Sequence, residues 1–112
     1  MPRPTVISLE WDHCYESALV DRSPGIDAVV CLPPAGLGLS PALARRLEAW
    51  LDDQEAASGH VVRGEPETDE TRAEDARLDR RLLDLAYAVQ HELGAYVEVL
   101  IRGEPLAGRH RR

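Results

Sequence analysis

Three residue types are missing from this 112-residue chain, which has no lysine, no asparagine and no phenylalanine. All three have AT-rich codons, so their joint absence indicates a GC-rich bacterial genome, and the excess of arginine is not evidence of selection for phosphate contacts. The thirteen basic residues are outnumbered by twenty acidic ones, and the net charge of −7 disfavours general affinity for nucleic acid. Long hydrophobic runs are missing too, and none approaches the roughly 20 residues of a membrane span.

Cysteine is scarce: Cys14 and Cys31 flank the loop between two expected strands. A disulfide between them is conceivable. The N-terminal Met-Pro-Arg-Pro continues directly into a strand-like segment without a signal peptide, so we expect a cytoplasmic protein with free thiols. A chain of this length buries roughly two thirds of its surface in one domain and needs neither a metal nor a disulfide to hold its core.

The most regular stretch is residues 71–94, which we expect to form one long helix around which the rest packs. Its apolar residues recur at the spacing of one helical face and are Leu78, Leu82, Leu85, Ala86, Val89 and Leu93. Gly94 follows them, where a left-handed backbone ends a helix without a steric penalty.

An earlier helix opens at Ser40 and Pro41, because Ser40 can cap the free amides and proline suits the first helical position. Its buried face is formed by Leu43, Leu47, Trp50 and Leu51. We expect this helix to fade at residues 56–59 and residues 58–70 to form a polar loop.

Three strands complete the expected elements. Residues 5–12 alternate between apolar and polar side chains, as a half-buried strand does. Residues 26–32 are a run of apolar residues typical of a central strand. Residues 96–102 form the last strand, and residues 18–20 offer a further short one.

The order is therefore β-β-α-α-β, and we expect an α+β fold of two layers, a small β-sheet covered by two antiparallel helices. Residues 1–105 would form this single domain, and residues 106–112 a basic, disordered tail. With the helices on one face, the other face of the sheet stays open. Val6, Tyr96 and Leu100 would form a partly apolar patch there, which a homodimer would cover.

The densest polar cluster surrounds His13 and Cys14, and a cysteine beside a histidine permits a thiolate nucleophile. Adjacent residues point to different sides, however, and no cysteine-protease signature is present. We therefore expect no catalytic residues, with an enzyme that uses this Cys/His pair as an alternative.

Metal binding is not expected either. The two cysteines and four histidines show no C-x₂-C or H-x₃-H spacing, and His91-Glu92 lacks the second histidine of a metalloprotease helix. The glycines of Gly36-Leu-Gly38 are not a phosphate-binding loop. We expect no cofactor.

The clearest non-random feature is the acidity of the stretch from Glu48 to Asp75, where ten carboxylates meet two arginines, a net charge of −8. A solvated loop and polar helix ends account for such a pattern, since acidic residues favour a helix N-terminus. The functional interpretation is a docking face for a basic protein. Its residues would be Asp52, Asp53, Glu55, Glu65, Glu67, Asp69 and Glu70.

A resemblance supports the expected order of elements. The run Leu37-Gly-Leu-Ser-Pro-Ala-Leu43, followed by Trp50, and the run Glu92-Leu-Gly94 before a Val-Glu-Val strand resemble a group of short uncharacterised actinobacterial proteins. Those proteins share an N-terminal strand, an L-S-P-x-L helix start, a tryptophan in that helix and a second helix that ends in E-L-G. The resemblance covers most of the chain and implies no catalytic residue.

Together these features predict a small acidic, non-catalytic protein-binding module, most concretely an inhibitor or immunity-type protein that covers a basic partner. The alternatives are a small enzyme that uses the Cys/His pair, or a structural subunit that forms homo-oligomers.

Overall fold

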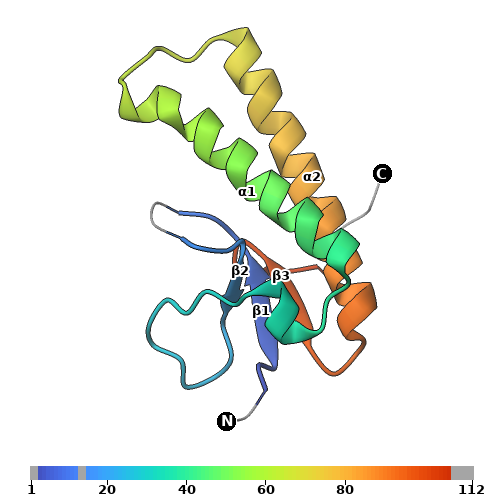
Figure 1. Ribbon diagram of the computed structural model, residues 1–112. Helices are drawn as coiled ribbons and strands as arrows, with labels where there is room; N and C mark the ends of the chain where they lie inside the picture. The colour runs from blue at the N-terminus through green and yellow to red at the C-terminus, as the bar shows by residue number, and fades with distance from the viewer. Residues whose placement is uncertain (1–2, 13–14, 107–112) are drawn as a thin grey trace.

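The computed structural model describes residues 3–12 and 15–106, and for residues 60–62 it describes the backbone only. The chain is α+β and has the expected order β-β-α-α-β, with one short strand added at the end. One sheet contains four strands in the order β2-β1-β3-β4. They are β1 (Val6–Leu9), β2 (Leu19–Asp21), β3 (Glu98–Ile101) and β4 (Glu104–Pro105). β1 pairs with β3 in parallel and with β2 antiparallel, and β3 and β4 form a hairpin (Figure 1).

Helices α1 (Pro41–Val62) and α2 (Asp69–Leu93) form an antiparallel hairpin whose lower half covers the sheet and whose upper half extends past it (Figure 1). α2 lies against β3, whereas α1 packs against α2 and the short 3₁₀ helix η1 (Pro34–Leu37). Over the described residues, neither helix has the combination of length and apolar character that crossing a membrane requires.

The start of α1 is capped as expected. Ser40 Oγ accepts a hydrogen bond from the Leu43 amide at 3.2 Å, which satisfies one of the free N–H groups of the first turn. A second element holds the cap in place: Glu92, near the end of α2, accepts hydrogen bonds from the Ser40 amide at 2.7 Å and from Ser40 Oγ at 2.8 Å. These bonds lower the pKa of Glu92, because they favour its charged form.

The two ends of α2 follow from local chemistry. The helix begins at Asp69, two residues earlier than expected, because Thr68 and Thr71 form a reciprocal capping box. It ends at Gly94, whose φ of 77° and ψ of −170° lie in a region open essentially only to glycine.

Five of the six residues of the predicted apolar stripe of α2 are buried, and the sixth, Leu93, is partly buried against the core. The core combines this stripe with side chains of α1 and with the inward-facing residues of the sheet. Its members include Leu43, Leu47 and Trp50 from α1, Leu78, Leu82, Leu85, Ala86 and Val89 from α2, and Ile7, Leu9, Leu19, Val99 and Ile101 from the sheet. Trp50 is fully buried, and its indole N–H donates to the Leu78 carbonyl at 2.9 Å, so it fixes how the two helices cross.

The expectation of a central strand at residues 26–32 is wrong. The strand beside β1 is β2, and of the predicted strand only residues 30–32 run along the outer edge of β2, with a single bridge between Val20 and Cys31. A run of apolar residues predicts an extended backbone, but a central strand also needs a paired strand on each side. The place beside β1 is taken by the shorter strand β2, whose three residues are all buried.

The boundaries of other segments also differ from those expected from the sequence. α1 does not fade at residues 56–59 but continues to Val62, and Ala57 packs against the core, so the connection between the helices shortens to residues 63–68. Leu106, assigned to the tail from sequence, is only 8% exposed and belongs to the core. Residues 107–112 lie outside the described residues.

Candidate protein-binding site

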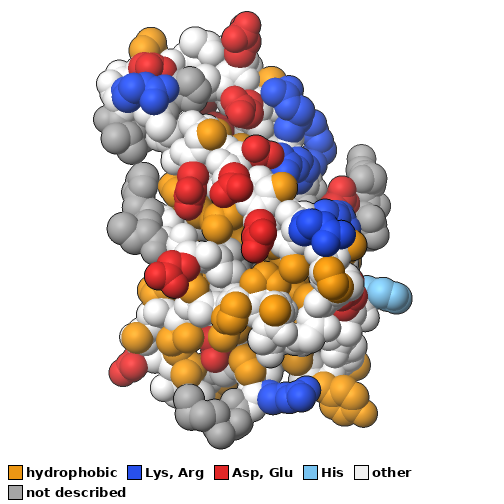
Figure 2. Space-filling model, viewed as in Figure 1, with side chains coloured by type: hydrophobic (Ala, Val, Ile, Leu, Met, Phe, Trp, Pro, Cys, Tyr) orange, Lys and Arg blue, Asp and Glu red, His pale blue; other side chains and the backbone are white. Residues whose placement is uncertain are grey.

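The acidic residues of the predicted docking face occupy several surfaces of the helical hairpin. Asp52 and Glu55 lie with Glu48 on the solvent-exposed side of α1, at the i, i+4, i+7 spacing of one helical face. Figure 2 shows acidic side chains spread over the upper, helical half of the molecule. Glu70 is exposed in the first turn of α2, beside the partial positive charge of the helix N-terminus.

Three of the seven predicted residues are in ion pairs. Asp53 Oδ2 lies 2.7 Å from an Arg81 nitrogen and joins α1 to α2. Within single segments, Asp69 pairs with Arg72 at 2.6 Å and Glu65 with Arg63 at 2.8 Å. The hydrogen bond from Arg63 to Glu65 raises the pKa of the arginine. These three carboxylates are therefore partly neutralised, whereas the structure gives Asp52, Glu55, Glu67 and Glu70 no ion pair within the described residues.

A cavity of about 390 Å³ with several carboxylates in its lining lies between the helical hairpin and the end of the sheet, and we call it the acidic hollow. It is bounded by α1, the connection between the helices, α2, and two residues of the sheet layer. Its lining residues are Trp11, Gln54, Ala57, Ser58, Glu65, Pro66, Glu67, Thr71, Glu74, Asp75, Asp79 and Arg102. Five of these are carboxylates and one is an arginine.

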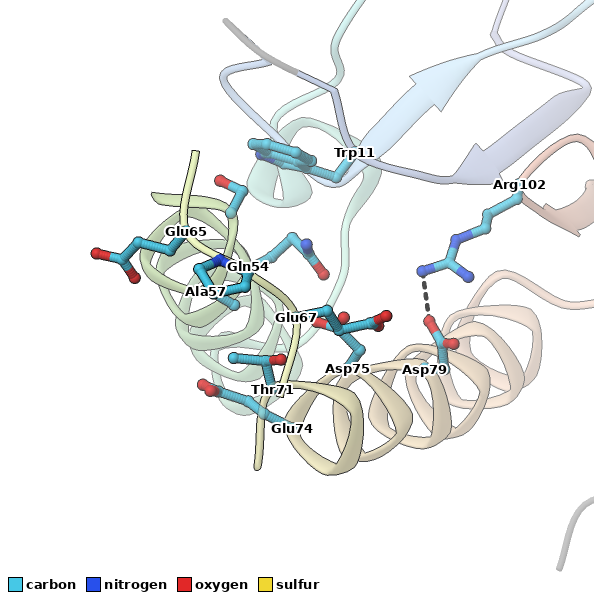
Figure 3. Close-up of a pocket in the computed structure, with 12 residues that line it drawn as sticks. Trp11, Gln54, Ala57, Glu65, Glu67, Thr71, Glu74, Asp75, Asp79 and Arg102 are labelled. Atoms are coloured by element: carbon cyan, nitrogen blue, oxygen red, sulfur yellow. Dashed lines mark ion pairs between the residues drawn. The ribbon is translucent and has the colours of Figure 1, made fainter. Parts of the chain in front are cut away.

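The arrangement of the side chains is visible in Figure 3. Glu67 and Asp75 extend into the gap between the hairpin and Trp11, whereas Glu65 and Glu74 point away from it. Arg102 reaches from the turn between β3 and β4 to Asp79, and the two charged groups are 2.6 Å apart. This pair offsets the charge of Arg102, so the other carboxylates among the described lining residues keep the hollow negative.

Apolar groups complete the hollow. Trp11 follows the end of β1 and packs partly against the core, and Ala57 of α1 does the same. Pro66, from the connection between the helices, also belongs to the lining. A negative cavity with an aromatic wall matches the alkyl chain and cationic end of an arginine or lysine side chain.

The sequence alone indicated only part of this site. It named Glu65 and Glu67, and the acidic stretch also contained Glu74 and Asp75, but Trp11 and Arg102 were not recognised. No local signal links those two residues to the hairpin, because strand pairing between β1 and β3 brings them there. The available hint was that Trp11 is a large aromatic residue at the end of a short strand.

Basic residues lie elsewhere on the hairpin. Arg77, Arg80 and Arg81 are exposed on α2, and Figure 2 shows basic side chains gathered along one margin of the helical layer. Arg46 and Arg81 line a shallow groove between the two helices. The arginines are therefore concentrated along one margin of the hairpin, where Asp53 and Asp84 lie among them.

The other sequence candidates are placed as follows. His13 and Cys14 lie outside the described residues, while Cys31 is half-buried and has no disulfide to any described residue. Among the described side chains, which leave out those of residues 60–62, no group of three or more histidine, cysteine, aspartate or glutamate residues is placed to hold a metal ion.

The proposed interface patch is not assembled as expected. Val6 and Leu100 are half-buried in the sheet. Tyr96, which is 94% exposed, lies in the turn before β3 and lines a separate groove with Leu37 and Leu93. The strand predicted at residues 96–102 begins only at Glu98, so Tyr96 does not follow its alternation.

Comparisons of the chain with protein-family models, with curated proteins and with solved structures found no match.

Proposed function

We propose that the protein is a small, non-catalytic binding module that covers a basic protein, as an inhibitor or immunity-type protein does. The observation that carries this proposal is the acidic hollow. It combines an excess of carboxylates over arginine with an aromatic wall and a volume within the usual range of binding pockets. An arginine or lysine of the partner would place its alkyl chain against Trp11 and its charge between Glu67 and Asp75.

The exposed acidic side of α1 has a different part in the proposal. Glu48, Asp52 and Glu55 are solvent-exposed, and an exposed charge pair contributes only about 0–1 kcal/mol of affinity. Together such charges accelerate the encounter with a basic protein by one or more orders of magnitude, and salt screens that effect. The exposed carboxylates of α1 and those of the hollow would together set the association rate, and contacts with Trp11 in the hollow would set the dissociation rate.

The test begins with capture of the partner from the native host and measurement of association rates at low and moderate ionic strength. The first variant neutralises three carboxylates of the lining: Glu67→Gln and Asp75→Asn, which extend into the hollow, and Glu74→Gln beside them. The matched control neutralises three exposed carboxylates elsewhere, Glu16→Gln, Asp27→Asn and Glu98→Gln. Both triples change the net charge by the same amount.

We expect the hollow triple to slow association by about tenfold or more at low salt and to flatten its salt dependence. The control triple should slow association by less than about threefold, since its charges lie away from the contact. Trp11→Leu should increase the dissociation rate with little effect on association, with the melting temperature measured to confirm folding. An acidic partner, association that is insensitive to salt, or equal effects of the two triples would contradict the proposal.

A further inference from the structure

Over the part of the chain that the structure describes, the outer edge of the sheet beside β2 is open. Residues 30–32 run along β2: the Asp21 amide donates to the Val30 carbonyl at 2.9 Å, and the Leu32 amide donates to the Leu19 carbonyl at 2.8 Å. The backbone groups of alternate residues in an antiparallel pair point to opposite sides, so the N–H and C=O of Cys31 point away from β2. Among the described residues, no hydrogen bond uses these groups or those of Val29.

The side chains of this edge are apolar and exposed. Ile26, Val29 and Val30 are 44%, 55% and 39% exposed, and β-branched residues of this kind favour extended backbone. Residues 28–32 contain no charge and no proline, the usual means by which proteins protect a sheet edge. The same segment has the sequence of a buried strand, yet the structure gives it a single bridge to β2 and, among the described residues, no strand on its outer side.

We propose that a second copy of this chain supplies the neighbour, so that residues 29–31 of two molecules pair antiparallel about a two-fold axis. Val29 of each copy faces Cys31 of the other, and the two Val30 residues meet at the axis. This register uses the outward N–H and C=O of Val29 and Cys31 in both copies. The register that places Cys31 opposite itself would set Val29 against Pro33, which has no N–H to donate.

The distribution of charge selects a second copy as the occupant. Residues 23–39 carry a single charge, Asp27, while the stretch from Glu48 to Asp75 carries −8. The edge lies at the opposite end of the molecule from the tip of the helical hairpin, so pairing there keeps the acidic stretches of two copies apart (Figure 1). Figure 2 shows the lower half of the visible face rich in apolar side chains and poor in charge. A basic partner would find no complementary charge at this edge.

The small size of the edge sets the strength of the dimer. Three exposed side chains and a short backbone ladder bury less than the roughly 1,000 Å² of a stable interface. We therefore expect a reversible dimer with a dissociation constant of tens to hundreds of micromolar, which is about −5 to −6 kcal/mol. The pairing uses no residue of the acidic hollow, so it is independent of the proposed function.

The first experiment is sedimentation equilibrium from about 10 µM to about 1 mM, a range that brackets this dissociation constant. The variant Val29→Lys places a charge on the edge at an exposed position, and Tyr96→Lys is the control, because Tyr96 is also an exposed large hydrophobic residue but lies away from the edge. Val29→Lys should raise the dissociation constant at least about tenfold, and Tyr96→Lys should change it by less than about twofold. Melting curves establish that both variants are folded.

The second experiment tests the register. In a chain with Cys14→Ser and Cys31→Ser, Val30→Cys should form a disulfide-linked dimer when oxidised glutathione accepts the electrons. The Cα atoms of a non-hydrogen-bonded antiparallel pair are about 4.5 Å apart, within disulfide range. Ile26→Cys in the same background is the control and should cross-link much more slowly.

A wild-type chain that stays monomeric over the whole concentration range overturns the proposal. The edge would then be available to pair with a strand of another protein. A dimer that survives Val29→Lys, or that Tyr96→Lys also abolishes, overturns it as well. Equal cross-linking at positions 26 and 30 would refute the register.

Discussion

The contact between Ser40 and Glu92 links the start of α1 to the end of α2, and its contribution to stability can be predicted in detail. Ser40→Ala removes the cap of the Leu43 amide and the bond from Ser40 Oγ to Glu92. An N-cap serine contributes about 1 kcal/mol, so we expect a loss of about 1–2 kcal/mol in the free energy of unfolding. Glu92→Gln keeps one acceptor oxygen but loses the charge. Because Glu92 is exposed, we expect this change to cost less than about 1 kcal/mol.

The double variant distinguishes a shared contact from two independent ones. Ser40→Ala and Glu92→Gln remove partners of the same hydrogen bonds, so their combined cost should be smaller than the sum of the single costs by about 0.5 kcal/mol. Urea denaturation of the wild type and the three variants measures the cycle. Glu98→Gln is the control, since it removes an exposed carboxylate from the outer face of the sheet.

The same contact makes stability depend on pH with a definite sign. The hydrogen bonds from Ser40 lower the pKa of Glu92 below its ordinary value of 4.5. A carboxylate whose pKa is lower in the folded state stabilises the fold above the unfolded pKa, and this contribution is lost as pH falls through the folded pKa. The difference in stability between the wild type and Glu92→Gln should thus be constant near neutral pH and shrink below pH 4.5. A difference that stays the same down to about pH 3.5, or exact additivity in the cycle, would refute this reasoning.

Two further changes test the core and the connection from α2 to β3. Leu85 is only 3% exposed, so Leu85→Ala should lower the free energy of unfolding by about 2–5 kcal/mol; an unchanged melting temperature would contradict the packing of α2. Gln90 donates to the carbonyls of Gly94 and Val97 at 2.9 and 2.8 Å and accepts from the Val99 amide at 3.0 Å. Gln90→Leu removes all three bonds and should cost about 2–3 kcal/mol, with faster hydrogen exchange at Val99, and unchanged exchange there would count against the contribution of Gln90.

The helices were the most predictable part of the fold, because their signals are local. The apolar stripe of α2 depends only on a spacing of 3.6 residues, and the ends at Ser40 and Gly94 depend on the conformational preferences of one or two residues. The class of the fold followed from the order of these elements. The start of α2 was misplaced because its threonine capping box lacks the usual glutamate or glutamine.

Contacts between distant residues decided the rest. The chain contains two candidate strands near β1, and periodicity alone could not tell that β2 takes the place beside it while residues 26–32 remain at the edge. In the same way, the sequence determined that residues 48–75 are acidic, but pairing of β1 with β3 decided that Trp11 and Arg102 complete the hollow with them. Conformational preferences act over a few residues along the sequence. The burial of a residue and its contacts with distant residues are fixed only when the sheet and the helical hairpin pack together.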